Sequence, residues 1–147
     1  MGQQQRYRSC VDLHLIVRNG AGHVLLGERR NTGWADGQLG LPSGHLEDGE
    51  PVTAGAVREG EEEIGIVIKP EKLVLVHLMH HHTDSGRVAL FFQATTWSGE
   101  IVNREPDKCA GWDFVPRDAL PANVVPYVGE ALAHYSVGVA FSERGWG

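Results

Sequence analysis

Residues 58 to 63 read "REGEEE" and place four glutamates beside one arginine. On a helix, Glu59, Glu62 and Glu63 stand at positions i, i+3 and i+4, so their side chains share one face. Each like-charged pair would destabilise an isolated helix by about 0.2–0.5 kcal/mol. Three converging carboxylates suit a hard divalent cation such as Mg²⁺, which prefers oxygen ligands. The alternative is a solvated acidic surface, because most runs of like charge are simply exposed to water.

The spacing of the residues around these glutamates favours the first interpretation. The pattern runs through Gly44, Glu50, Arg58, Glu59, Glu62, Glu63, Gly65 and Ile66. This stretch, "GHLEDGEPVTAGAVREGEEEIGI", resembles the signature of the Nudix hydrolases, which specifies glycine, glutamate, arginine and aliphatic residues at fixed intervals. Eight of its nine specified positions match, and a chance match of that quality has a probability of about 10⁻⁶. The departure is Gly60, where an aliphatic residue is usual. A glycine there costs about 1 kcal/mol relative to alanine but allows a close approach to a sheet.

The resemblance implies a reaction and a role for each of these side chains. Nudix hydrolases cleave a nucleoside diphosphate linked to another group, X. The three glutamates are assigned to binding Mg²⁺, for which Mn²⁺ can substitute, with the Gly44 carbonyl as a further ligand. One glutamate also takes the proton from the attacking water, and Arg58 orients the cluster through ion pairs. The predicted catalytic residues are therefore Glu59, Glu62, Glu63 and Arg58.

Two tryptophans and a run of histidines are candidates for binding the rest of the substrate. Trp112 follows "EPDKCAG", a segment similar to one in MutT-like members that act on nucleoside triphosphates. Trp34 lies in the loop before the glutamate motif. Either ring could stack on a base, or belong to the core. In "HLMHHH", His80 and His82 share one face of a strand while His81 points away, and they predict a polar wall near the substrate or plain surface. A zinc site is disfavoured because no Cys or Glu follows at zinc spacing.

The identity of X stays open at this point. Members selective for ADP-ribose tend to carry a proline about one strand after the motif, and no proline follows Pro70 in that region. We therefore expect hydrolysis of a nucleoside triphosphate to the monophosphate and pyrophosphate. The alternatives are an ADP-ribose or nucleotide-sugar pyrophosphatase, and a catalytically silent nucleotide-binding or regulatory module. Silent relatives usually lack one of the carboxylates, and all are present here.

Composition narrows the range of partners. The net charge is −6 and no cluster of Lys or Arg occurs, which argues against a nucleic-acid polymer and leaves a small nucleotide as the expected substrate. No apolar run approaches the roughly 20 residues that cross a bilayer, and the N-terminal stretch does not resemble a signal peptide. Cys10 and Cys109 are expected to be reduced thiols. These features predict a cytoplasmic protein that is a monomer or a homodimer.

The elements that must position these residues follow from periodicity and turn residues. Strands are predicted at residues 10–17, 23–29, 72–82, 87–97 and 111–116, and helices at residues 51–64 and 125–136. The first helix begins with a proline and ends at a glycine, as helices often do. Residues 31–50 are rich in Gly, Asn and Asp and predict a long structured loop. Together they predict one α+β domain over residues 1–147, with a mixed β-sheet between helices (α/β/α), as in the Nudix fold.

Overall fold

The computed structural model describes residues 5–147 and has the predicted α+β architecture. Its strands are β1 (Cys10–Val17), β2 (Val24–Arg29), β3 (Leu39–Gly40), β4 (Ser43–His45), β5 (Val74–His82), β6 (Gly86–Ala94), β7 (Cys109–Val115) and β8 (Phe141–Arg144). Its helices are α1 (Val52–Ile64) and α2 (Pro126–Ser136), with a short 3₁₀ helix at Pro70–Lys72. Within residues 5–147, none of the helices has the length and apolar character needed to span a bilayer.

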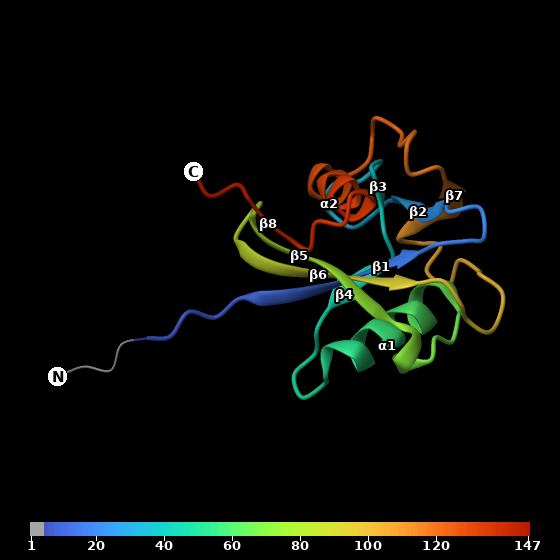
Figure 1. Ribbon diagram of the computed structural model, residues 1–147, viewed down its shortest axis with the longest axis horizontal. Coiled ribbons are helices and arrows are strands. Elements are labelled where there is room, and N and C mark those ends of the chain that lie inside the picture. The colour runs from blue at the N-terminus through green and yellow to red at the C-terminus, as the bar shows by residue number, and fades with distance from the viewer. Residues whose placement is uncertain (1–4) are drawn as a thin grey trace.

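The strands form two sheets. The larger has the order β4-β1-β6-β5-β8 and the smaller the order β3-β2-β7. In the larger sheet β1 runs parallel to β6 along its whole length, whereas β5 and β6 form an antiparallel pair. Figure 1 shows α1 on one face of this sheet and α2 on the other. The prediction of a mixed sheet between helices is therefore confirmed.

Strand β1 separates two apolar cores, because its side chains alternate between the faces of the sheet. Leu13 and Leu15 pack in one core with Ile64 of α1. Ile16 packs in the other core with Leu132 of α2. The polar residues of β1 share the second face, so they point toward the α2 side of the molecule.

Helix α1 is held close to the sheet. A Cβ atom at Gly60 would lie 3.2 Å from Leu15 Cδ1 and 3.3 Å from Ile68 Cδ1. Both contacts are tight, so the missing side chain lets the helix approach β1, as the sequence suggested. The helix ends at Gly65, whose φ of 73° lies in the left-handed region that favours glycine. The carboxylate-bearing face of α1 is thus fixed against the larger sheet.

The structure adds three strands that periodicity did not indicate. β3 and β4 lie inside the loop predicted at residues 31–50, and β8 pairs in parallel with β5 near the C-terminus. Each has four residues or fewer, which is too short for an alternating pattern to be read. The strand predicted at 87–97 instead ends at residue 94, where the chain leaves the sheet.

Candidate active site

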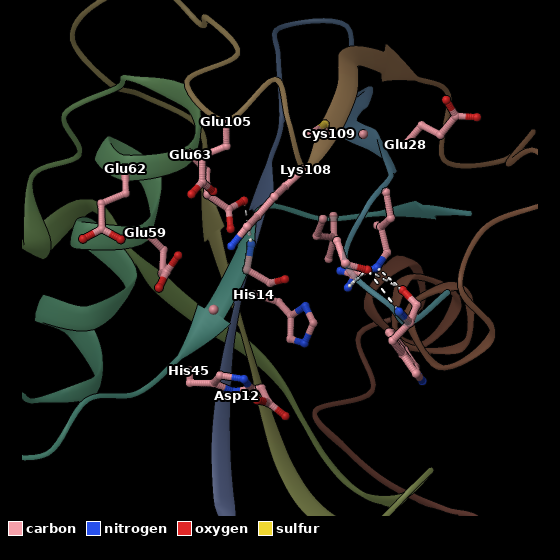
Figure 2. Close-up of a pocket in the computed structure, with 18 of the residues that line it drawn as sticks. Asp12, His14, Glu28, His45, Glu59, Glu62, Glu63, Glu105, Lys108 and Cys109 are labelled. Carbon is pink, nitrogen blue, oxygen red and sulfur yellow. Dashed lines mark hydrogen bonds and ion pairs between the residues drawn. The ribbon is translucent and has the colours of Figure 1, made fainter. Parts of the chain in front are cut away.

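A cavity of about 760 Å³ opens where the two sheets meet α1. Residues from strands β1 to β7 and from both helices line it, and Figure 2 shows many of them. Its volume lies in the range of small-molecule sites, about 300–1,000 Å³. Elements distant in the sequence therefore contribute to one open cavity.

Three glutamates of α1 form one wall of this cavity. Glu59, Glu62 and Glu63 all line it and project from the same helix, with His14 of β1 on the opposite side (Figure 2). Glu61 is exposed and does not line the cavity. The three glutamates are thus brought together as the helical spacing indicated.

Arg58 connects these carboxylates to the loop before the helix. Its Nη1 donates to Oε1 of Glu59 at 2.8 Å and to Oε2 of Glu62 at 3.1 Å. Its Nη2 and Nε donate to the two carboxylate oxygens of Glu50 at 2.7 and 3.1 Å. The bidentate pair with Arg58 holds the pKa of Glu50 below its usual value. Arg58 therefore orients Glu59 and Glu62 relative to the loop, consistent with its expected role.

Burial and mutual repulsion act on the two inner carboxyl groups. Burial, with the nearby charge of Glu59, raises the pKa of Glu63 to about 9, although the Ser43 N–H donates to its Oε2 at 3.2 Å. Burial also raises the pKa of Glu59, and the hydrogen bond from Arg58 opposes this effect. The positive charge near these two carboxyl groups is therefore too small to offset the effect of burial on their pKa values.

The Glu59 carboxylate lies directly against Gly44. A Cβ atom at Gly44 would lie 2.0 Å from Oε1 of Glu59, so only glycine leaves this space free. Gly44 is the residue whose carbonyl the sequence resemblance added to the ligand set. The carboxylate and the loop backbone thus meet at one point of the cavity wall.

The donor atoms at this wall fit Mg²⁺. Within residues 5–147, no three acidic, Cys or His side chains are already gathered tightly enough to hold a metal. Glu59 and Glu62 are instead paired with Arg58. Mg²⁺ binds proteins through one or two carboxylates and keeps several waters. The hard oxygen donors and the deficit of positive charge match this preference.

The two tryptophans occupy different parts of the cavity. Trp112 lies flat on β2, where a Cβ atom at Gly27 would lie 2.6 Å from its ring. It also packs against the apolar core, and its buried Nε1 has no partner among the described residues. Trp34 is 38% exposed, and the Arg29 guanidinium lies 5.1 Å from its ring centroid. Both line the cavity, and Trp112 combines core packing with exposure to the site.

The histidines of β5 are placed differently from what the sequence suggested. His80 and His82 do not line the cavity and instead contact Trp146, at ring distances of 4.5 and 5.4 Å. His81 lines it and stacks on Tyr127 at 4.5 Å. The side chains of β5 alternate as expected. The face that carries His81, and not the one that carries His80 and His82, borders the cavity, because α2 packs against the His81 face.

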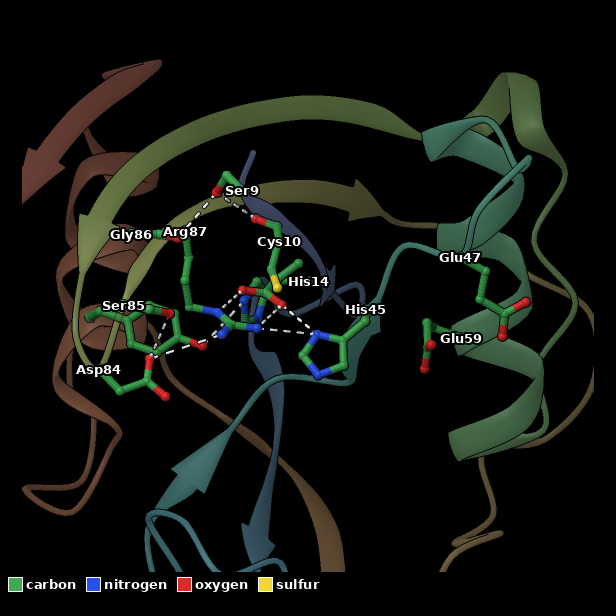
Figure 3. Close-up of polar contacts among 12 residues, drawn as sticks. Ser9, Cys10, His14, His45, Glu47, Glu59, Asp84, Ser85, Gly86 and Arg87 are labelled. Carbon is green, nitrogen blue, oxygen red and sulfur yellow. Dashed lines mark hydrogen bonds and ion pairs between the residues drawn. The ribbon is translucent and has the colours of Figure 1, made fainter. Parts of the chain in front are cut away.

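Sequence reasoning missed a charged cluster on the larger sheet. Arg87 donates to both oxygens of Asp12 at 2.7 and 2.9 Å, and Nδ1 of His45 lies 2.7 Å from the same carboxylate. Figure 3 shows Arg87 of β6 and His45 of β4 converging beside His14. Burial alone would raise the pKa of Asp12, but the bonds from Arg87 and His45 outweigh it and lower that pKa. A polar residue at every second position of an otherwise apolar strand, as at Asp12 and His14, was the available signal.

Comparison with known proteins identifies the family. The NUDIX domain matches residues 10–135, most of the chain. The chain belongs to the NUDIX family. This membership confirms the resemblance seen in the glutamate motif and places the chain among hydrolases of phosphorus anhydrides.

Solved structures agree with the family assignment. The NUDIX fold here is similar to a MutT NUDIX hydrolase from Burkholderia pseudomallei, with a TM-score of 0.78, 28% identity, and coverage of 86% of this chain and 98% of that one. A MutT protein from Methanosarcina mazei Go1 has the same TM-score at 16% identity, covering 91% of this chain and 97% of that one, which shows the fold alone.

Curated relatives match over a shorter stretch. An RNA pyrophosphohydrolase of Wolbachia sp. subsp. Brugia malayi is 38% identical over 63 residues, 43% of this chain and 36% of that protein. An RNA pyrophosphohydrolase of Roseobacter denitrificans is 43% identical over 60 residues, 41% of this chain and 35% of that protein. The matched stretch therefore spans about a third of the length of these relatives.

Proposed function

We propose that this chain is a Mg²⁺-dependent pyrophosphohydrolase that cleaves a nucleoside 5′-triphosphate to the monophosphate and pyrophosphate, with Mn²⁺ able to replace Mg²⁺. The observation that carries the proposal is the wall of the cavity, where three glutamates share one helix face and Arg58 pairs with two of them, Glu59 and Glu62. A cavity of this size, with aromatic side chains away from the glutamates, suits a small molecule that is anionic at one end and aromatic at the other.

Each residue of the wall has a distinct task in this proposal. Glu59, Glu62 and Glu63 hold the metal together with the Gly44 carbonyl. When bound, the metal neutralises phosphate oxygens and lowers the pKa of a water. Arg58 holds the carboxylates of Glu59 and Glu62 in a fixed orientation. One of the glutamates takes the proton of the attacking water.

Positive side chains opposite the glutamates complete the phosphate end of the site. Arg29 and Lys108 both line the cavity, and Figure 2 shows Lys108 extending toward the glutamates. Such side chains stabilise charge that develops on transferred phosphoryl groups. In this proposal they hold the pyrophosphate leaving group.

A second candidate substrate is the 5′-triphosphate end of an RNA. The names of the curated relatives favour it. The net charge of −6 opposes it, because a protein that grips a polynucleotide backbone usually presents a basic surface. A cytoplasmic location and a monomeric or homodimeric state stay predictions from the sequence.

A panel of substrates tests this function. Pyrophosphate or phosphate release is measured for the common nucleoside triphosphates, ADP-ribose, a nucleotide sugar and a 5′-triphosphate RNA oligonucleotide, each with Mg²⁺ and with excess chelator. We expect the free triphosphates to be cleaved fastest, with pyrophosphate as product, and chelator to abolish turnover. Full turnover in chelator contradicts the metal assignment. Faster cleavage of the RNA end or of ADP-ribose contradicts the substrate assignment, and no turnover of any compound favours a silent binding module.

A further inference from the structure

Two buried histidines on the α2 side of the cavity have unused hydrogen-bonding capacity. His14 is 2% exposed and His81 is 1% exposed, and both line the cavity. Within the described chain, three buried side-chain atoms have no hydrogen-bond partner: Nδ1 of His14, Nε2 of His81 and, on β7, Nε1 of Trp112. A buried polar atom left unpaired costs about 1–3 kcal/mol, so native structures rarely keep such atoms without a reason.

The second nitrogen of each ring is bound by a hydroxyl group. Nε2 of His14 lies 3.3 Å from the Tyr127 hydroxyl, and Nδ1 of His81 lies 2.8 Å from the Thr83 hydroxyl. Because a hydroxyl can donate or accept, neither ring is locked into one tautomer. Burial lowers the pKa of His14 to about 4 and also lowers that of His81, so both rings are neutral near pH 7. Each free nitrogen can therefore serve as a donor or as an acceptor.

The surroundings of these rings are flat and aromatic. Phe91 stacks on His14 at 4.5 Å, and Tyr127 stacks on His81 at 4.5 Å while meeting His14 edge-on at 5.6 Å. Trp34 lies 6.2 Å from Tyr127. Phe91 is fully buried, so Trp34 and Tyr127 are the aromatic rings of this group that line the cavity and suit a planar ligand with polar edges.

The charged groups around Asp12 do not favour a second phosphate group in this part of the cavity. Arg29, another cation that acts on His14, lies over the Trp34 ring and donates to the Trp34 carbonyl. The guanidinium of Arg87 is bound by both oxygens of Asp12 and is offset by that carboxylate. Asp84 lies 3.9 Å from the same guanidinium. A neutral heterocycle is thus a better match for this end of the cavity than an anion.

We propose that His14 and His81 determine base specificity by hydrogen bonding to the edge of the substrate's nucleobase. This inference rests on the proposed function, which places the phosphates at the glutamates of α1. It assigns the base to the side of the cavity formed by β1, β5 and α2, rather than to Trp112 of β7. The missing partners of the two ring nitrogens are then atoms of the base itself.

Binding in the presence of chelator tests the inference without turnover. The variants His14→Phe and His81→Phe keep a flat ring in place but remove its nitrogens. Nucleoside monophosphates of the four common bases and ribose 5-phosphate, which has no base, are titrated calorimetrically. We expect each variant to bind the preferred monophosphate at least about tenfold more weakly, since one lost hydrogen bond worth 1.4 kcal/mol is a factor of ten. Ribose 5-phosphate should bind equally to all forms.

Two further variants separate recognition from folding. His82→Phe, on the same strand but outside the cavity, is the matched control and should bind as the parent protein does. His81→Gln and His14→Asn place an amide near the position of the lost ring nitrogen. Compared with the phenylalanine variants, they should regain part of the affinity or change which base is preferred. If a phenylalanine variant fails to fold, the amide variants alone carry the test, with the melting temperature measured alongside.

The outcomes also distinguish this inference from the proposed function. Unchanged affinity and unchanged base preference in both histidine positions overturn the inference, as does equal binding of monophosphates and ribose 5-phosphate by the parent protein. Selective binding that depends on His14 and His81 supports it, even if no triphosphate is hydrolysed. The absence of hydrolysis would overturn the proposed catalytic activity and leave the inference about base binding intact.

Discussion

The carboxylate of Glu59 occupies the space that a side chain of Gly44 would need. A Cβ atom at position 44 would lie 2.0 Å from Oε1 and 2.5 Å from Oε2 of Glu59. The loop and the helix therefore fit together only because residue 44 is glycine. A substitution at this position must displace the carboxylate rather than the backbone, since the end of a side chain moves more easily.

The first prediction follows from that contact. Gly44→Ala should reduce kcat at least about tenfold, because a misplaced ligand loses a contact that is strongest in the transition state. The melting temperature should change little. The matched control is Gly20→Ala, where a Cβ atom would meet nothing within 4 Å. Steady-state kinetics and a thermal melt on both variants check this, and equal activity of the two would show that Glu59 needs no fixed position.

The second prediction concerns the register of helix α1. Glu62→Gln or Glu63→Gln should lower kcat at least about a hundredfold, in line with the loss of one electrostatic contact to the transition state. Glu61→Gln should change kcat less than about twofold, because Glu61 is exposed and lies outside the cavity. Kinetics at saturating Mg²⁺ measure all three. Equal damage at Glu61 would mean that the wrong face of the helix has been assigned to catalysis.

The third prediction separates the two roles of Trp112. Its ring packs against Gly27 and the apolar core, so Trp112→Ala should destabilise the protein by about 3 kcal/mol. This corresponds to a fall in melting temperature of roughly 6–12 °C. With the base bound by His14 and His81, KM for the preferred triphosphate should change less than about threefold. A tenfold rise in KM at an unchanged melting temperature would instead show that Trp112 binds the base.

The fourth prediction concerns the stability of the protein in acid. Burial lowers the pKa of folded His14 to about 4, below its ordinary value of 6.5. The unfolded chain therefore binds a proton first as pH falls. The contribution of His14 to the free energy of unfolding is present above pH 6.5 and is lost progressively between pH 6.5 and 4. A shift of this size corresponds to about 3 kcal/mol.

Urea unfolding at pH 7, 5.5 and 4 measures this loss. The parent protein should lose about 3 kcal/mol more than His14→Phe between pH 7 and 4. His77 and His81 also have lowered pKa values, and their contribution cancels when the two proteins are compared. Parallel pH profiles for the parent protein and the variant would show that His14 does not carry the effect.

The sequence predicted the parts of the site that depend on local spacing. The face shared by Glu59, Glu62 and Glu63 follows from helical geometry alone, and the bounds of α1 follow from Pro51 and Gly65. The two helices and the longer strands were also predicted, because each has a clear period. Family membership then confirmed the resemblance that this motif carries.

The remainder of the site depends on how distant elements pack. Alternation separates His81 from His80 and His82, but only the docking of Tyr127 against β5 decides which face meets the cavity. Asp12 finds Arg87 because β1 pairs with β6, a pairing that local periodicity does not specify. The orphan nitrogen of His14 likewise becomes visible only when every neighbouring atom is placed.

The parallel pairing of β1 with β6 has a consequence for how the chain folds during synthesis. Asp12 and Arg87 meet across this pair although they are 75 residues apart. Long-range pairing closes a large loop and is slow, and chains emerge from the ribosome N-terminal end first. More than half of the chain must therefore be synthesised before β6, the parallel partner of the apolar strand β1, is available. Until then its edge can pair with another nascent chain, so weaker expression, which leaves fewer nascent chains close together, should raise the soluble yield.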